Sequence, residues 1–207
     1  MVSLIIPMRE DTYTARTQFR EQCLASIEAQ TYRDFEIIEV KSNHSVAVNT
    51  NIGLYKAKGE FFKVIGDDDW LPPTSLADLV EGMKDHPWIC SNAINVSGNT
   101  QSREIPPLEG LTFERMVQHN VVHNGTTLHR TKLLKEIGGM DESLWTAEEY
   151  EMHLRLMSKG YLPGYINKFV YFYRLHREQQ SRQLRIKNKP KRDEEIRRIQ
   201  ALYSNEV

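Results

Sequence analysis

Short apolar runs alternate with amphipathic stretches along the first 65 residues of the chain. The runs are five or six residues long, which is typical of strands buried in a parallel sheet, and they occupy 2–6, 35–40 and 61–65. Between them, apolar residues recur every three or four positions, which predicts helices over 15–30 and 46–57. This order predicts right-handed crossovers and a ligand crevice at the carboxyl ends of the strands.

The pattern is less regular after residue 73. Apolar runs predict strands over 88–96 and 169–173, and a polar stretch predicts a loop over 97–102. The remaining helices are expected near 74–85, 111–118, 131–137 and 148–158, where Gly138-Gly139 and Gly160 end the last two, and over 192–203 as a solvated helix of the basic tail. We therefore expect one α/β domain over 1–181, with a mostly parallel central sheet flanked by helices, and a basic C-terminal extension over 182–207.

Composition excludes several classes of protein. With 207 residues, 40% of them hydrophobic and 27% charged, the chain can form a real core and is neither disordered nor fibrous. The net charge of −1 gives no argument for nucleic-acid binding. However, residues 174–198 carry ten Lys or Arg against four Asp or Glu. That basic segment is either a solvated helix or a surface that touches anionic lipid near a lipid-linked acceptor.

Cysteine usage and the N-terminus bear on location. Cys23 and Cys90 stand far apart and lack metal-ligand spacing, so neither a disulfide framework nor a zinc site is expected. The first apolar run is too short for a signal peptide or a membrane span. We expect a cytoplasmic protein with at most peripheral membrane contact.

Three consecutive aspartates, Asp67, Asp68 and Asp69, follow the third predicted strand. Adjacent like charges are costly unless a cation or hydrogen-bond donors offset them. Carboxylates at alternate positions, as at Asp67 and Asp69, can direct oxygens at one Mg²⁺ or Mn²⁺, which in turn would hold a diphosphate. The alternative is a solvated turn or a cap for the next helix.

Five segments, taken in order and spacing, resemble family 2 glycosyltransferases of the GT-A fold. They are 2–7, 26–38, 51–60, 66–72 and a last one made of 137–142, 147–151 and 155–156. The resemblance covers residues 2–181 and implies a nucleotide-sugar half over about 1–73 and an acceptor half over about 74–181. It implies an inverting transfer from a nucleoside diphosphate sugar, with UDP favoured, to a hydroxyl of a glycan, lipid-linked or protein acceptor.

The same resemblance implies roles for residues of this chain. The family's catalytic base is an aspartate that follows a glutamate; that position is Glu149 here, with Glu148 before it as the reserve. Both glutamates would equally suit the positive end of a helix dipole. Metal ligands would be Asp67, Asp69 and His176, for Mn²⁺ or Mg²⁺. The implied nucleotide-sugar contacts are Pro7, Arg9, Lys41, Ser42, Asn51, Asp67, Asp68, Arg174 and Arg177.

Several positions depart from the family pattern. Lys41 and Ser42 stand in the turn where an aspartate usually accepts a hydrogen bond from uracil. A uracil nucleobase in the donor is therefore expected only because it is common in the family. Gly66 replaces the first aspartate of the usual acidic motif, and Thr50 replaces an arginine. Acceptor contacts should come from the variable second half and from Trp70; the candidates are Trp70, His123 and Trp145, which packing alone would also explain.

The sequence can also be compared with two alternative functions, an inactive binding module and a nucleotidyltransferase. A catalytically inactive module that binds a nucleotide-sugar or a glycan would explain the departures at Lys41, Thr50 and Gly66. A nucleotidyltransferase would need a glycine-rich, basic loop near residue 10, and no glycine is present there.

Overall fold

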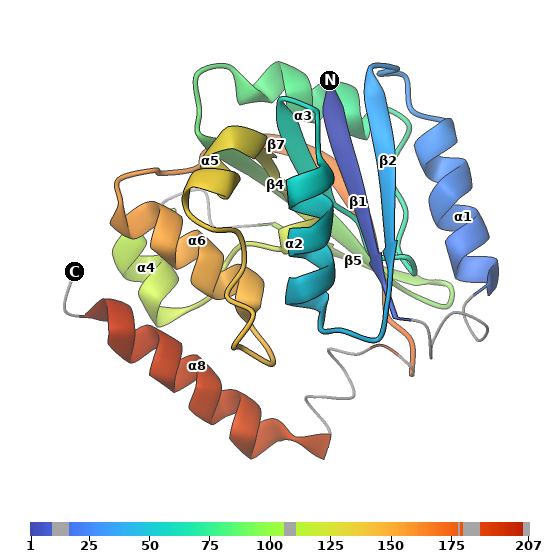
Figure 1. The fold of residues 1–207 in the computed structure, drawn as a ribbon. Coiled ribbons are helices and arrows are strands. Elements are labelled where there is room, and N and C mark those ends of the chain that lie inside the picture. The colour runs from blue at the N-terminus through green and yellow to red at the C-terminus, as the bar shows by residue number, and fades with distance from the viewer. Residues whose placement is uncertain (10–16, 106–110, 178, 180–186, 205–207) are drawn as a thin grey trace.

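A computed structural model describes residues 1–9, 17–105, 111–177, 179 and 187–204 (Figure 1). The strands are β1 (Val2–Met8), β2 (Phe35–Lys41), β3 (Phe61–Val64), β4 (Trp88–Ser97), β5 (Thr100–Glu104), β6 (Leu128–Arg130) and β7 (Gly164–Arg174). The helices are α1 (Thr17–Glu28), α2 (Val46–Lys56), α3 (Ser75–Met83), α4 (Phe113–Gln118), α5 (Thr131–Glu136), α6 (Glu148–Ser158) and α8 (Lys189–Tyr203), with a short 3₁₀ turn, η3 (Asn124–Thr126).

One seven-stranded sheet runs through the molecule in the order β2-β1-β3-β6-β4-β5, with β7 paired to β4. The α/β prediction is confirmed, and β1 pairs in parallel with both β2 and β3, as expected. The second half is mixed rather than mostly parallel. β6 is antiparallel to β3 and β4, β5 is antiparallel to β4, and β7 is parallel to β4.

Two strands differ from the sequence-based expectation. The loop predicted over 97–102 is wrong at residue 97, where β4 ends, and at residues 100–102, because the chain turns through Gly98 and Asn99 into β5. Gly98 has a φ of +56°, which a tight hairpin turn favours. β5 is polar because it is an exposed edge strand, so it lacks a buried apolar face. β6 has only three residues and is too short to show a period.

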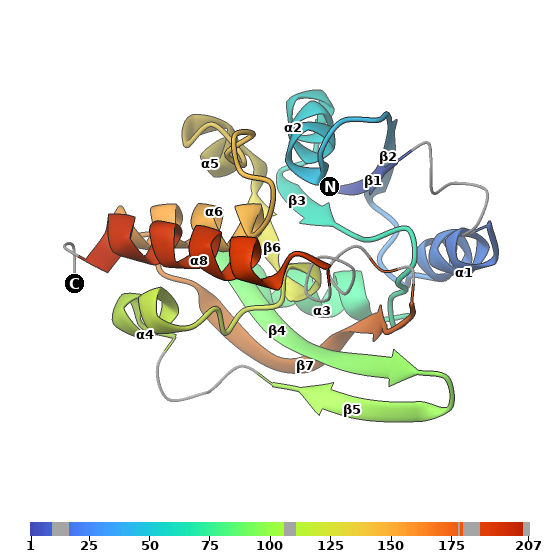
Figure 2. The same ribbon diagram turned by 90° about the horizontal axis from the view of Figure 1, so that it is seen from below.

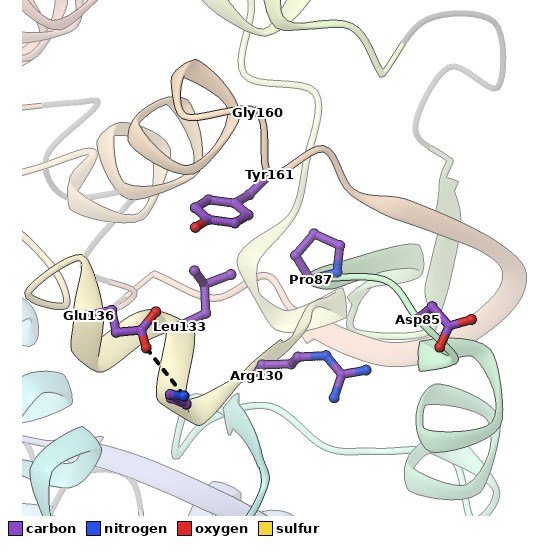
Figure 3. A pocket seen from close by; sticks show the side chains of 8 residues that line it. Asp85, Pro87, Arg130, Leu133, Glu136, Gly160 and Tyr161 are labelled. Atoms are coloured by element: carbon purple, nitrogen blue, oxygen red, sulfur yellow. Dashed lines mark ion pairs between the residues drawn. The ribbon is translucent and has the colours of Figure 1, made fainter.

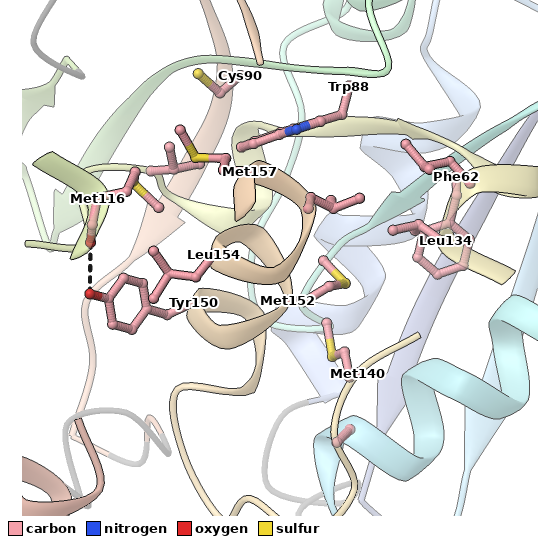
Figure 4. Close-up of a cluster of buried hydrophobic side chains, with 14 of the residues drawn as sticks. Phe62, Trp88, Cys90, Met116, Leu134, Met140, Tyr150, Met152, Leu154 and Met157 are labelled. Atoms are coloured by element: carbon pink, nitrogen blue, oxygen red, sulfur yellow. Dashed lines mark hydrogen bonds between the residues drawn. The ribbon is translucent and has the colours of Figure 1, made fainter. Parts of the chain in front are cut away.

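Each face of the sheet is covered by its own core. Leu4 and Ile6 pack with side chains of α1 and α3, whereas Ile5, between them in sequence, packs with side chains of α2, α5 and α6. This alternation is the two-residue period of a strand buried on both faces. The core that contains Ile5, which we call the second core, surrounds α6 (Figure 4), and Trp88 and Tyr150 are its largest fully buried side chains.

The C-terminal helix α8 is part of this second core. The predicted helix is confirmed and begins earlier, at Lys189. Ile199 is fully buried, and the Tyr203 hydroxyl donates a hydrogen bond of 2.6 Å to Glu151 Oε1 in α6. One face of α8 is thus packed rather than solvated, and both views show the helix alongside α6 (Figures 1 and 2). Residues 182–186 and 205–207 of the predicted extension lie outside the described residues.

No helix in the described ranges is both long and apolar enough to cross a membrane.

Candidate active site at the carboxyl edge of the sheet

The carboxyl ends of β1, β2 and β3 meet at one edge of the sheet, as parallel pairing requires. Met8 lies opposite Lys41, and the Ser42 amide donates to the Met8 carbonyl, so Pro7 and Arg9 at the end of β1 stand close to Lys41 and Ser42 at the end of β2. Asn49 of α2 joins the two strand ends, because its side-chain amide donates to the Met8 carbonyl and its Oδ1 accepts from the Ser42 hydroxyl. The structure therefore brings these four predicted donor contacts to the same edge.

The three aspartates form a tight loop directly after β3, which we call the acidic loop (residues 66–69). The Asp69 amide donates to the Gly66 carbonyl at 3.2 Å, and all three aspartate residues are buried. A Cβ at Gly66 would lie 2.9 Å from carboxylate oxygens of both Asp68 and Asp69. A side chain at position 66 would therefore require the carboxylates of Asp68 and Asp69 to shift.

Both oxygens of Asp69 accept hydrogen bonds from β7. The Tyr171 hydroxyl donates to Oδ2 and the Arg174 amide donates to Oδ1, each at 2.7 Å. Burial and the neighbouring Asp68 charge raise the pKa of Asp69 well above its usual range, while the two donors oppose that rise. Tyr171 is itself buried and also accepts from the Gly66 amide, so one tyrosine fixes both ends of the acidic loop.

Asp68 is held by the segment that follows β7. His176 Nε2 lies 2.8 Å from Asp68 Oδ2, and Arg174 Nε donates to the Asp68 carbonyl at 2.7 Å. The Arg174 guanidinium is sandwiched between Phe19 and Trp70, with its carbon 4.2 Å and 4.5 Å from their ring centroids. Arg174 therefore fastens β7 to the acidic loop, and its proposed contact with phosphate stays a prediction.

The donor set in this place suits a divalent cation. Oxygen ligands from carboxylates and one imidazole nitrogen match Mn²⁺, and the structure brings Asp68 and His176 within 3 Å of each other. Within the described ranges, three or more side chains of metal-ligating type do not converge on one point. The predicted ligands Asp67 and Asp69 flank that pair, and the structure places His176 on Asp68 rather than on either of them.

Two predicted site residues have well-defined structural partners. The Asn51 amide group donates to the Met140 carbonyl and to Glu142 Oε1, each at 2.9 Å, and its Oδ1 accepts from the Met140 amide. It therefore ties α2 to the loop that leads into α6. Trp70 stacks on Phe172 at 5.0 Å and pairs with its backbone. Their predicted contacts with donor and acceptor remain predictions.

His123 packs against two tyrosines of β7, one of which, Tyr171, contacts the acidic loop. Its ring centroid is 5.3 Å from that of Tyr171 and 4.6 Å from that of Tyr173. Burial lowers the pKa of His123, and its Nδ1 accepts from the Gly125 amide. A neutral histidine in this place can exchange hydrogen bonds with a sugar hydroxyl, which agrees with its predicted acceptor role.

The first turn of α6 carries the two candidate catalytic glutamates. Ala147, which precedes it, has a φ of +60°, a left-handed conformation that costs an alanine about 1–2 kcal/mol. Burial and the neighbouring charge of Glu149 raise the pKa of Glu148 to about 7. Burial also raises the pKa of Glu149, and the Arg192 charge on α8 partly opposes that rise. Strained backbone and raised pKa values are typical of functional sites.

Arg155 holds this turn against the loop before it. Its guanidinium donates to both oxygens of Glu151, each at 3.0 Å, and to the carbonyls of Ile137 and Gly139. Figure 1 shows the first turn of α6 on the same side of the molecule as the carboxyl ends of β1–β3. The acidic loop and the glutamates thus face the same side from different elements.

Sequence reasoning missed Tyr171 and Lys63, which support the acidic loop from inside the core. Lys63 is fully buried, and its Nζ donates to the Gly125 carbonyl at 2.6 Å and lies 5.5 Å from the Tyr171 ring centroid. Burial lowers the pKa of Lys63 to about 7. A lysine inside the apolar run 61–65 was the available signal.

A cavity of about 470 Å³ lies elsewhere, at the opposite edge of the sheet (Figure 3). It lies where β3 begins and β6 ends, and Tyr161, Leu133 and Pro87 line it. Arg130 at its rim is engaged by Glu60 and by the carbonyls of Lys84 and His86. This cavity contains none of the predicted site residues.

A mixed α/β sheet with an acidic loop after its third strand is the architecture of GT-A glycosyltransferases. The family model for glycosyl transferase family 2 matches residues 29–138, more than half of the chain. The chain belongs to this family, as its motifs predicted.

Curated relatives are distant. An O-antigen biosynthesis protein of Myxococcus xanthus, RfbC, is 22% identical over 84% of this chain, which corresponds to 16% of that protein. An uncharacterised glycosyltransferase of Rickettsia typhi is 24% identical over 76% of this chain and 58% of its own length. The chain therefore spans less than two thirds of each of these relatives.

Solved structures share the fold. TarS residues 1–349 of S. aureus, crystallised with UDP, superposes with a TM-score of 0.68 at 17% identity, over 97% of this chain and 64% of that one. The mannosyltransferase PcManGT of Pyrobaculum calidifontis, in complex with GDP-Man and Mn²⁺, superposes with a TM-score of 0.61 at 16% identity. The match covers 86% of this chain and 57% of that one. The predicted GT-A fold is confirmed.

Proposed function

We propose that this domain transfers a sugar from a nucleoside diphosphate sugar to an acceptor hydroxyl, with inversion, at the carboxyl edge of the sheet. The observation that carries the proposal is the 2.8 Å contact between His176 and Asp68, which joins the segment after β7 to the acidic loop. The relatives with UDP, UDP-GlcNAc or GDP-Man and Mn²⁺ support a donor of this class.

On the donor side, Asp68 and His176 are the residues best placed to hold a divalent cation, with Asp67 and Asp69 beside them. Such a cation, when bound, would neutralise the charge that grows on the diphosphate leaving group. Pro7, Arg9, Lys41 and Ser42 would then border the nucleotide, together with Arg177. We favour UDP as the nucleotide, because relatives with the same fold were crystallised with UDP and UDP-GlcNAc.

On the acceptor side, Glu149 takes the proton from the attacking hydroxyl, and Glu148 is the second candidate. The acceptor oxygen bonds to the anomeric carbon from one face while the bond to the diphosphate oxygen breaks on the other, which inverts the centre. A base whose pKa is raised toward neutrality accepts a hydroxyl proton more effectively than an ordinary carboxylate. His123 and Trp145 would contact the acceptor, a glycan, lipid-linked or protein molecule, on the cytoplasmic side of the membrane.

Calorimetric titration of UDP, GDP, CDP and dTDP, each with and without Mn²⁺ or Mg²⁺, tests the donor half of this proposal. We expect one nucleotide to bind, to need the metal, and to lose that dependence in Asp68→Ala. Its sugar conjugates then test turnover. Absence of binding by every nucleotide would refute the proposal, and binding without turnover would support an inactive binding module instead.

A further inference from the structure

Basic side chains of α8 lie beside the candidate catalytic turn of α6. Lys191 Nζ lies 4.8 Å from the centroid of the Trp145 ring, two residues before the left-handed Ala147. The Arg192 charge acts on Glu149 strongly enough to oppose the rise in its pKa. Figure 2 shows α8 running along α6.

Carboxylates offset the charges of these two cations only in part within the part of the chain that the structure describes. There, Lys191 forms no ion pair, and Arg192 reaches only its neighbour Asp193, at 3.6 Å. Neither cation pairs with Glu148 or Glu149 inside the 4 Å limit of an ion pair. Lys191 is exposed on the indole face and Arg192 is half-buried, so both retain donors for a ligand.

The fold fixes the place of these cations. The C-terminal half of α8 is anchored by buried Ile199, by the Tyr203 bond to Glu151, and by a hydrogen bond of 2.8 Å from Gln200 Nε2 to the Gln118 carbonyl. The N-terminal half carries the cations and lacks such anchors in the described residues. A helix anchored at one half holds Lys191 and Arg192 near Glu149 without using their charges.

We propose that Lys191 and Arg192 bind a phosphate group of the acceptor, so that the domain selects phosphate-bearing acceptors. This inference rests on the proposed function. A guanidinium fork and an ammonium are the donors that recognise phosphate oxygens, and Trp145 offers an apolar face to the adjoining sugar or polyol. The phosphate is carried either by a soluble sugar phosphate or by a lipid headgroup, since both present the same oxygens.

The nitrogen-15 spectrum of the Trp145 indole in the full chain tests this, after assignment with Trp145→Phe. We expect glucose 6-phosphate and glycerol 3-phosphate to shift the Trp145 signal, and glucose and glycerol to leave it unchanged. The double variant Lys191→Met, Arg192→Gln should weaken phosphate binding by about tenfold or more, because two charge-assisted hydrogen bonds are lost. Arg197→Gln, an exposed position on the same helix, is the matched control and should bind as the wild type does.

Vesicles distinguish the two sources of phosphate. A shift with phosphatidylglycerol vesicles, absent with phosphatidylcholine alone and absent in the double variant, would assign the phosphate to a lipid. Equal shifts by neutral and phosphorylated probes, no shift by any phosphate, or phosphate binding unchanged in the double variant would overturn the inference. Metal-dependent nucleotide binding, measured on the same samples, separates this failure from a failure of the proposed function and shows that the variant is folded.

Discussion

The acidic loop and the first turn of α6 differ in how their carboxylates are held. In the acidic loop, Asp69 accepts two short hydrogen bonds from β7 and Asp68 meets His176, so these side chains have defined partners. In α6, Glu148 and Glu149 lack an ion pair within the described residues, and a strained Ala147 precedes them.

This difference assigns different tasks to the two regions. Carboxylates with fixed partners keep one geometry, which a metal and a diphosphate need. Burial raises the pKa values of Glu148 and Glu149 in spite of backbone hydrogen bonds to their carboxylates, and a raised pKa favours proton transfer. We therefore propose that the acidic loop binds the donor and that the first turn of α6 activates the acceptor.

Removal of a carboxylate from the acidic loop should have the largest effect on binding. Asp68→Ala leaves His176 without its partner and removes an oxygen ligand, so we expect metal-dependent nucleotide affinity to fall about 100-fold. Calorimetry with Mn²⁺ measures it. Asp78→Ala is the matched control, since Asp78 pairs with Lys168 away from this edge, and equal losses in both variants would contradict the assignment.

Tyr171→Phe should have the next largest effect, because the tyrosine hydroxyl donates to Asp69 and fixes the orientation of that carboxylate. We expect metal-dependent nucleotide affinity to fall about tenfold. Tyr165→Phe removes a hydroxyl on the same strand that donates to Asn92 instead, and should leave affinity unchanged. An unchanged affinity in Tyr171→Phe would show that Asp69 does not need this donor.

Lys63 should make stability depend on pH. Its pKa in the folded chain is about 7, below the usual 10.5, so between these values the unfolded chain holds a proton that the folded chain lacks. Stability conferred at this position therefore rises with pH across that window, by up to about 1.4 kcal/mol per pH unit.

Urea unfolding of the wild type and of Lys63→Met from pH 6 to pH 10 measures the contribution of Lys63 as the difference between the unfolding free energies of the two proteins. We expect the unfolding free energy of the wild type, relative to that of Lys63→Met, to increase with pH. Lys168→Met, at a largely exposed lysine, is the control and should give a difference that does not vary with pH. A flat difference for Lys63→Met would mean that Lys63 is charged in the folded chain throughout.

Ala147→Gly should have the smallest effect, and this effect should be a gain in stability rather than a loss. Glycine adopts the left-handed conformation without the alanine penalty but loses more entropy on folding, so we expect a gain of about 0.5 kcal/mol in unfolding free energy. Thermal unfolding measures it. Ala57→Gly, at a φ of −60°, should destabilise instead; a loss in both variants would show that Ala147 is not strained.

Much of the first half could be predicted from the sequence because its strands are buried on both faces and show as apolar runs. β5 and β6 could not, since one is a polar edge strand and the other has three residues. Those strands are defined by their partners rather than by their own pattern.

The candidate site was predictable only where its residues were unusual in their own segment or matched the family pattern. Three adjacent aspartates are unusual, whereas two glutamates at a helix start are common, and Glu148 and Glu149 were singled out by the family resemblance. Tyr171 is an ordinary residue of an apolar strand, and its importance comes from Asp69, 102 positions away. The pairing of His176 with Asp68 rather than its neighbours depends on side-chain placement that spacing does not encode.

The division of labour between the two regions is tested most directly by Glu149→Gln, in which nucleotide affinity and the rate of sugar transfer are measured on the same sample. Glutamine keeps the shape of the side chain and cannot accept the proton. We expect an unchanged Kd for the metal-bound nucleotide and a rate of sugar transfer that is lower by a factor of about 10²–10⁴. Transfer at the wild-type rate would contradict this division of labour, and so would a loss of nucleotide binding as large as that of Asp68→Ala.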